Sequence, residues 1–165
     1  MSTIEKKPEL IAPAGNFDKL HFAITYGADA VYFGGNEFNL RVKTQNFDRE
    51  ELAKAVDLCS ANNVKTIFLM NAFLHESDLN TVKAFINEIK DFTFSAIMIS
   101  DPGMLLLLQE EGISIPLHLS TQVSTLNHKA VNFWHNQGIN RIVLGREVTL
   151  NEIKVIKEYS DCEIE

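Results

Sequence analysis

The chain has 165 residues, the length of one domain and enough to bury a sizeable core. Its hydrophobic fraction of 45% is ordinary for a globular protein, and no apolar run is long enough to span a bilayer, so we expect no membrane partner. The net charge of -7 and the pI near 5.2 argue against nucleic-acid binding by this segment through electrostatic contacts alone, because phosphate contacts need clustered Lys and Arg.

The first eight residues, MSTIEKKP, carry charges but lack the apolar region of a secretory signal, so we expect a short tail at 1–8. Two cysteines, Cys59 and Cys162, form neither a metal-binding motif nor a disulfide framework. We expect both to be reduced thiols, which predicts a cytoplasmic protein.

Short apolar runs alternate with amphipathic segments from residue 9 onward, the pattern typical of parallel βα units. The expected strands are 9–14, 30–33, 66–72, 96–100, 116–122 and 141–145, and 162–165 resembles the opening of a seventh. The expected helices are 17–26, 49–62, 78–92, 104–111, 127–137 and 150–159. The absence of a linker or a composition break predicts one architectural unit.

The segment PLHLSTQ at 116–122 has two unlike faces as a strand, because successive side chains alternate. One face carries imidazole, hydroxyl and amide groups, from His118, Ser120 and Gln122. By itself this pattern fits a half-exposed strand as well as a barrel strand that turns its polar face to a lumen. The succession of units fits either an open doubly wound sheet or an incomplete eight-stranded barrel, and the polar face favours the barrel. We therefore predict the α/β class, with an incomplete TIM-type (β/α) barrel over 9–165 made of about six βα units and the start of a seventh strand.

Polar side chains collect at the expected carboxyl ends of the strands, where barrels and open α/β sheets place their chemistry. The candidate substrate-binding residues are Asn16, Glu37, Arg41, Asn71, Asp101, Ser120, Gln122 and Arg146. The candidate catalytic residues are His118 and Glu147. Such a set fits a small anionic molecule, with Arg41 and Arg146 as carboxylate clamps. The structural alternatives are helix caps at Asn16 and Asp101 and a surface ion pair between Arg146 and Glu147.

Metal and nucleophile chemistry find little support in the sequence. His75 and His118 lie on different units without a spaced partner motif, so we predict hydrogen-bonded structural histidines and no metal site. Ser120 lies on an expected strand without a G-x-S-x-G elbow. Gly34 and Gly35 fit a close backbone approach, but without G-x-G-x-x-G they are weak evidence for a nucleotide.

Several long motifs, found in order along most of the chain, resemble the N-terminal region of the U32 collagenase-like peptidase family. They are ELIAPAGN (9–16), YGADAVYFGGNEFNLR (26–41), DPGM (101–104), HLSTQ (118–122), FW (133–134) and RIVLGREVTLNEI (141–153). The resemblance implies a barrel-like N-terminal domain. It also implies either the family's historical peptidase activity or the oxygen-independent hydroxylation of tRNA uridine, rRNA cytidine or ubiquinone precursors, with prephenate as the oxygen source.

The hydroxylating members carry an iron-sulfur cluster held by four cysteines, and Cys59 and Cys162 do not match those positions. We therefore expect a truncated N-terminal segment that binds no cofactor itself, whose full-length parent holds the cluster and contacts RNA through the missing regions. A prephenate-like anion is the expected small ligand, and self-association through the open barrel edge is a further expectation. The alternatives are a peptidase and a catalytically inert binding fragment.

Overall fold

The computed structural model describes residues 7–39 and 46–165. The strands are β1 (Ile11–Pro13), β2 (Ala30–Gly34), β3 (Lys65–Met70), β4 (Ala96–Ile99), β5 (Leu117–Leu119), β6 (Ile139–Ile142) and β7 (Glu163–Ile164). The helices are α1 (Phe17–Thr25), α2 (Arg49–Ala61), α3 (Leu79–Ile89), α4 (Pro102–Glu110), α5 (His128–Asn136) and α6 (Leu150–Tyr159), with 3-10 turns η1 (Glu76–Asp78) and η2 (Thr121–Val123).

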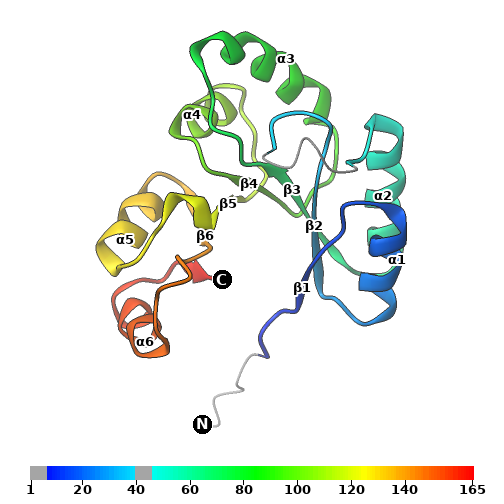
Figure 1. Cartoon of the computed structure of the whole chain (residues 1–165). Coiled ribbons are helices and arrows are strands. Elements are labelled where there is room, and N and C mark those ends of the chain that lie inside the picture. The colour runs from blue at the N-terminus through cyan, green and yellow to red at the C-terminus, as the bar shows by residue number, and fades with distance from the viewer. Residues whose placement is uncertain (1–6, 40–45) are drawn as a thin grey trace.

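The seven strands are parallel and neighbour one another in chain order, from β1 to β7. Figure 1 shows the sheet curled, with the helices arranged around its outer side and with β1 and β7 as its two ends. A doubly wound sheet reverses its strand order at a switch point, whereas a (β/α) barrel does not. The prediction of an incomplete TIM-type barrel is confirmed.

Side-chain caps explain where most of the helices begin. Asn16, Asp48, Asp101, Asn127 and Thr149 each precede a helix and accept a hydrogen bond from a backbone N–H of its first turn. Each cap satisfies a donor that has no partner inside the helix and contributes about 1 kcal/mol. These short polar residues therefore set the boundaries between the strand-end loops and the helices.

The apolar core has two parts because the sheet has two covered faces. The larger part lies between the sheet and the helices, where the rings of Phe68 and Phe94 stack with centroids 4.6 Å apart. A smaller cluster faces the concave side, which we call the lumen; it consists of Ala30, Ile67, Leu69, Ala96 and Met98. The alternation of strand side chains thus separates a helix-facing core from a lumen lining.

The fifth and sixth strands differ from the prediction. β5 ends at Leu119 instead of continuing to residue 122, because the chain turns into η2. β6 begins at Ile139 and carries an irregularity opposite β5, where Asn140 Oδ1 accepts the Leu117 N–H at 2.9 Å. This bulge inserts one residue, so Ile139 and Ile142 are both buried in the helix-facing core and Arg141 turns to the lumen.

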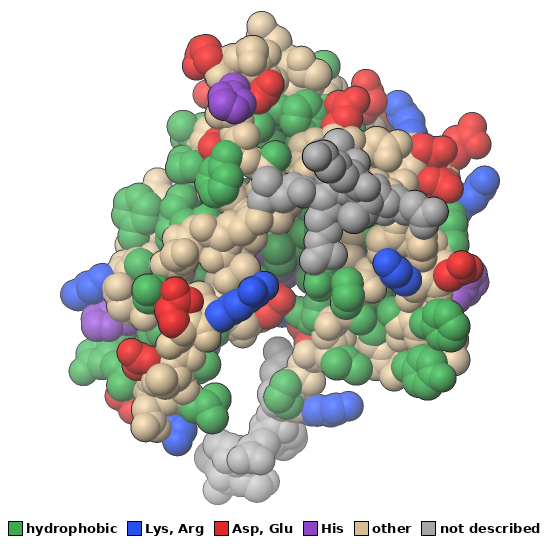
Figure 2. All heavy atoms as spheres, in the orientation of Figure 1, with side chains coloured by type: hydrophobic (Ala, Val, Ile, Leu, Met, Phe, Trp, Pro, Cys, Tyr) green, Lys and Arg blue, Asp and Glu red, His purple; other side chains and the backbone are tan. Residues whose placement is uncertain are grey.

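Both helices nearest the ends of the sheet expose apolar side chains, as do α4 at Leu106 and α5 at Phe133. On α1, Phe22 is 63% exposed and stacks on the exposed Tyr26, with ring centroids 6.4 Å apart. On α6, Leu150 is 78% exposed and Tyr159 is also exposed. Figure 2 shows apolar side chains over α1 on the right and over α5 and α6 on the left. Within the described part of the chain, no helix has both the length and the apolar character to cross a bilayer.

Candidate functional site

The carboxyl ends of the parallel strands meet at one end of the half-barrel. Between β1, β2 and β3 this end holds a cavity of about 430 Å³, which we call the carboxyl-end cavity. Its lining includes Gly15, Lys19, Tyr32, Asn39 and Leu69. The cavity combines a primary amine, a phenol and an amide with an apolar floor, which suits a small polar molecule.

Asn39 explains the glycine at position 34, the last residue of β2. Its side chain is buried, and its Nδ2 donates a hydrogen bond to the carbonyl of Gly35. A Cβ atom on Gly34 would lie 2.8 Å from that Nδ2, so only glycine leaves room for the amide. The close approach that the sequence indicated is therefore made by a side chain of the same chain.

Asn16 and Asp101 both act as helix caps. Asn16 Oδ1 accepts from the Lys19 N–H at 3.0 Å. Asp101 Oδ1 accepts from the Met104 N–H at 3.1 Å, and its Oδ2 accepts from the Leu74 N–H at 3.4 Å. The capping alternative is thus present for both residues, and their contact with a substrate stays a prediction.

Ser120 and Gln122 lie just beyond β5, where Ser120 is buried and Gln122 is exposed on η2. Ser100, at the end of β4, donates its hydroxyl to Gln122 Oε1 at 2.9 Å. Thr121 donates its hydroxyl to the carbonyl of Leu144 at 2.9 Å and so joins the ends of β5 and β6. Ser100 was missed as a site residue, although its place between an apolar run and Asp101 could have indicated it.

Arg146 and Glu147 follow β6 at the same end, and both side chains are exposed. No ion pair joins them among the described residues, so the guanidinium of Arg146 is available to a ligand. A Cβ atom on Gly145 would lie 2.4 Å from Leu126 Cδ2, so any larger residue there would require the Leu126 side chain to move. An unpaired cation at a strand end fits the predicted anion-binding role.

The remaining candidates are dispersed. Glu37 lines a separate cavity of about 310 Å³ between α2 and α3, together with Phe47 and Phe85. Asn71 is half-buried immediately after β3, and Arg41 lies outside the described residues. His75 is exposed, and its backbone N–H donates to Asp78 Oδ2 at 2.8 Å.

His118 faces the lumen but lines a cavity at the opposite end, among the residues at the beginnings of the strands. This amino-end cavity has a volume of about 830 Å³, and its lining includes Glu9, Lys65, Arg141 and Glu163 but neither Ser120 nor Glu147. His118 is 7% exposed, and its Nδ1 has no hydrogen-bond partner among the described residues. Burial, with the nearby charge of Arg141, lowers the pKa of His118 to about 4, so the imidazole is neutral at pH 7.

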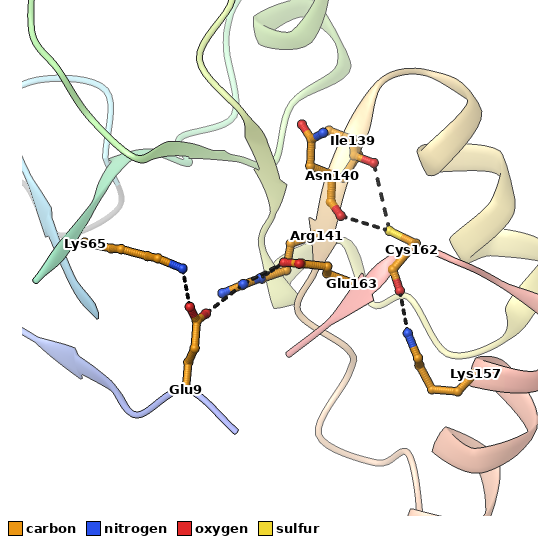
Figure 3. A network of polar contacts seen from close by, with 8 residues as sticks. All are labelled: Glu9, Lys65, Ile139, Asn140, Arg141, Lys157, Cys162 and Glu163. Carbon is orange, nitrogen blue, oxygen red and sulfur yellow. Dashed lines mark hydrogen bonds and ion pairs between the residues drawn. The ribbon is translucent and has the colours of Figure 1, made fainter. Parts of the chain in front are cut away.

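An ion network rims the amino-end cavity (Figure 3). Glu9 pairs with Lys65 and accepts a hydrogen bond from Arg141 Nη2 at 2.8 Å. Arg141 also donates from Nε and Nη2 to Glu163 Oε2, at 2.9 and 2.6 Å. The hydrogen bonds from Lys65 and Arg141 lower the pKa of the Glu9 carboxyl to about 2. The sequence does not point to Arg141 as a site residue. The bulge that turns its side chain toward the lumen cannot be recognised in the chain alone.

The cysteines do not fit an iron-sulfur cluster. Cys59 and Cys162 are both buried, and Cys162 Sγ donates to the carbonyl of Asn140 at 3.5 Å. Burial raises the pKa of the Cys59 thiol to about 11, which opposes the thiolate form that binds iron. Among residues 7–39 and 46–165, no group of three or more His, Cys, Asp or Glu side chains is placed to hold a metal ion.

Comparison with known proteins identifies the family. A tRNA hydroxylation protein P1 of Bacillus subtilis is 40% identical over 162 residues, covering 98% of this chain and 38% of the relative. A collagenase of Porphyromonas gingivalis is 32% identical over 151 residues, covering 91% of this chain and 36% of the relative. The chain therefore spans little more than a third of the length of these relatives.

A solved structure shares the fold, and a family model covers most of the chain. The solved structure of the U32 peptidase Mk0906 superposes with a TM-score of 0.76 at 12% identity, covering 99% of this chain and 71% of the other, which shows a shared fold. The family model for peptidase family U32 matches residues 15–165. The expected resemblance is thus confirmed, and the chain belongs to peptidase family U32.

Proposed function

We propose that this chain is the N-terminal barrel segment of a cytoplasmic protein that, as a whole, hydroxylates tRNA or rRNA bases with prephenate as the oxygen donor. The observation that carries the proposal is the 40% identity to a tRNA hydroxylation protein over 98% of the chain. Identity at that level along the whole barrel segment favours a shared reaction class over a shared fold alone.

The contribution of this segment is to hold the small anionic donor at the carboxyl ends of the strands. Arg146 supplies a guanidinium that has no ion pair within the described part of the chain and can bind a carboxylate through two parallel hydrogen bonds. Polar groups of Asn71, after β3, and of Ser120 and Gln122, after β5, lie at the same end of the sheet. Arg41 is proposed as a second clamp on the same donor.

RNA is bound by other parts of the parent protein in this proposal, because the segment carries a net charge of -7. The iron-sulfur cluster likewise takes its cysteines from outside this chain, since two buried thiols do not supply four ligands. The cluster would provide electron-transfer chemistry, and the barrel segment would bind and orient the donor.

The family name favours a second candidate, a peptidase. Peptide hydrolysis needs an activated nucleophile or a metal-bound water. Ser120 is buried without a histidine partner, and His118 lines the cavity at the other end of the lumen, so the described residues supply neither requirement. We rank the peptidase below the hydroxylase, and a catalytically inert binding fragment is the third candidate.

Self-association of the isolated segment is part of the proposal. Over residues 7–39 and 46–165, β1 and β7 each pair on one side only, and the helices beside them expose Phe22, Tyr26, Leu150 and Tyr159. Unpaired strand edges and exposed apolar side chains are sites at which two copies of a chain associate.

Mass spectrometry of tRNA and rRNA from a strain that lacks the complete gene tests the proposed function. A missing hydroxylated base, restored by the complete gene but not by its Arg146→Ala form, is the expected result. Arg49→Ala, which removes an exposed arginine on α2, is the matched control and should restore the base. Unchanged RNA together with lost gelatin cleavage would favour the peptidase instead.

A further inference from the structure

Arg141 occupies an unusual position for a charged side chain, because the bulge at Asn140 turns it into the lumen with only 14% of its side chain exposed. Arg141 and Glu163 face each other in register on neighbouring strands, β6 and β7. Its bond to Glu9 is different, since Glu9 lies 132 residues away in the chain, just before β1. Arg141 therefore links the two ends of the sheet.

Glu9 extends this link to β3. One carboxylate oxygen accepts from Arg141 and the other pairs with Lys65 at the start of β3, as Figure 3 shows. The backbone ladder joins only neighbouring strands, and in the described chain β1 and β7 are not paired with each other. The backbone hydrogen bonds thus leave the separation of the two ends undetermined, whereas the Glu9–Arg141 bond spans it.

The bond has the features of an ion pair that contributes measurable stability. Exposed pairs between flexible side chains contribute about 0 to 1 kcal/mol. Here the arginine is partly buried and held by two carboxylates, and Glu9 is 26% exposed. Hydrogen bonds between charged groups at such sites are stronger and more directional than those at an open surface.

We infer that Glu9 and Arg141 form an ionic clasp that holds the two ends of the open sheet at a fixed separation, which makes Arg141 a positioning residue. Asn16 lies just beyond β1 and Arg146 just beyond β6, so the angle between these strands sets the distance between polar groups at the carboxyl end. The clasp acts at the amino end and aligns the opposite end because each strand is short and stiff. The inference concerns the 165-residue chain without any ligand, and it does not depend on the proposed function.

Distance measurement between spin labels on the two flanking helices tests the clasp. His21→Cys on α1 and Glu158→Cys on α6 place labels at exposed positions, and both native cysteines are buried from the reagent. In the Glu9→Ala background the distance distribution should shift to longer values and broaden roughly twofold, because the edges of the sheet then open at lower free energy. Arg141→Lys in the background that keeps Glu9 retains the positive charge and should keep part of the narrow distribution, whereas Arg141→Ala should broaden it as Glu9→Ala does.

Glu111→Ala is the matched control, because it removes the 2.9 Å ion pair with Lys83 between α3 and α4, away from the sheet ends. It should leave the distribution unchanged. Glu9→Gln provides a second variant if Glu9→Ala does not fold, which circular dichroism establishes. A folded Glu9 variant with the parental distribution would overturn the inference.

Discussion

At the scale of single residues, burial decides the behaviour of His118. The ordinary histidine pKa of 6.5 falls to about 4 in the folded protein, so the unfolded chain binds a proton that the folded chain does not between these values. Stability contributed by the neutral imidazole is therefore complete above pH 6.5 and is lost as the pH falls toward 4. The loss over that range is up to about 3 kcal/mol.

His118→Gln should flatten the dependence of the free energy of unfolding on pH between 6.5 and 4, because glutamine does not titrate. Urea unfolding at a series of pH values measures this slope. Below about pH 4.5 both proteins should still lose stability, since the Glu9 carboxyl with its pKa near 2 then binds protons on unfolding. His21→Gln, at an exposed position on α1, should leave the parental slope intact. A parental slope in His118→Gln would show that the lowered pKa of His118 does not cause the pH dependence.

At Gly34, the neighbouring Asn39 side chain leaves no room for a Cβ atom. Gly34→Ala should lower the free energy of unfolding by about 2 kcal/mol, because its Cβ meets Asn39 Nδ2 at 2.8 Å and the amide is buried. Gly35→Ala is the adjacent control, since its Cβ would lie at an ordinary 3.4 Å from the Phe68 ring. Equal effects in chemical denaturation would show that the Asn39 contact is not the cause.

At the scale of elements, the bulge in β6 determines which face of the sheet receives Arg141. Asn140 makes the bulge possible by accepting the Leu117 N–H that the ladder leaves free. Asn140→Ala should lower the free energy of unfolding by about 1 to 2 kcal/mol, because that buried donor loses its acceptor. Asn140→Asp keeps an acceptor at the same place and should lose less. Thermal unfolding of both variants distinguishes a lost hydrogen bond from a general change at this position.

At the scale of the whole molecule, the two ends of the sheet and their exposed helices govern association. Phe22→Ser on α1 should weaken the proposed self-association while leaving the fold intact, because that ring is 63% exposed. Sedimentation velocity over a wide concentration range measures the effect. Leu106→Ser, at an exposed apolar position on α4 away from the sheet ends, should have little influence. A parental protein that is monomeric at every concentration would refute self-association itself.

The sequence by itself determined the succession of βα units, since apolar runs, N-caps such as Asp48 and Asn127, and turn glycines act over a few neighbouring residues. It also indicated that polar groups follow the strands, as with Ser120 and Arg146. These features depend on residues only a few positions apart in the chain, which stay close together in any fold. The predicted helices accordingly begin and end within a few residues of the observed ones.

Only the tertiary structure decided which polar groups meet. It placed His118 with Glu9 and Arg141 at the amino end, because a strand inside a curled sheet offers its lumen face to two different cavities. It turned Arg141 inward through a one-residue bulge, and it filled the space over Gly34 with Asn39. Contacts between residues as far apart as Glu9 and Arg141 depend on how the sheet curls, and no short pattern in the chain encodes that curvature.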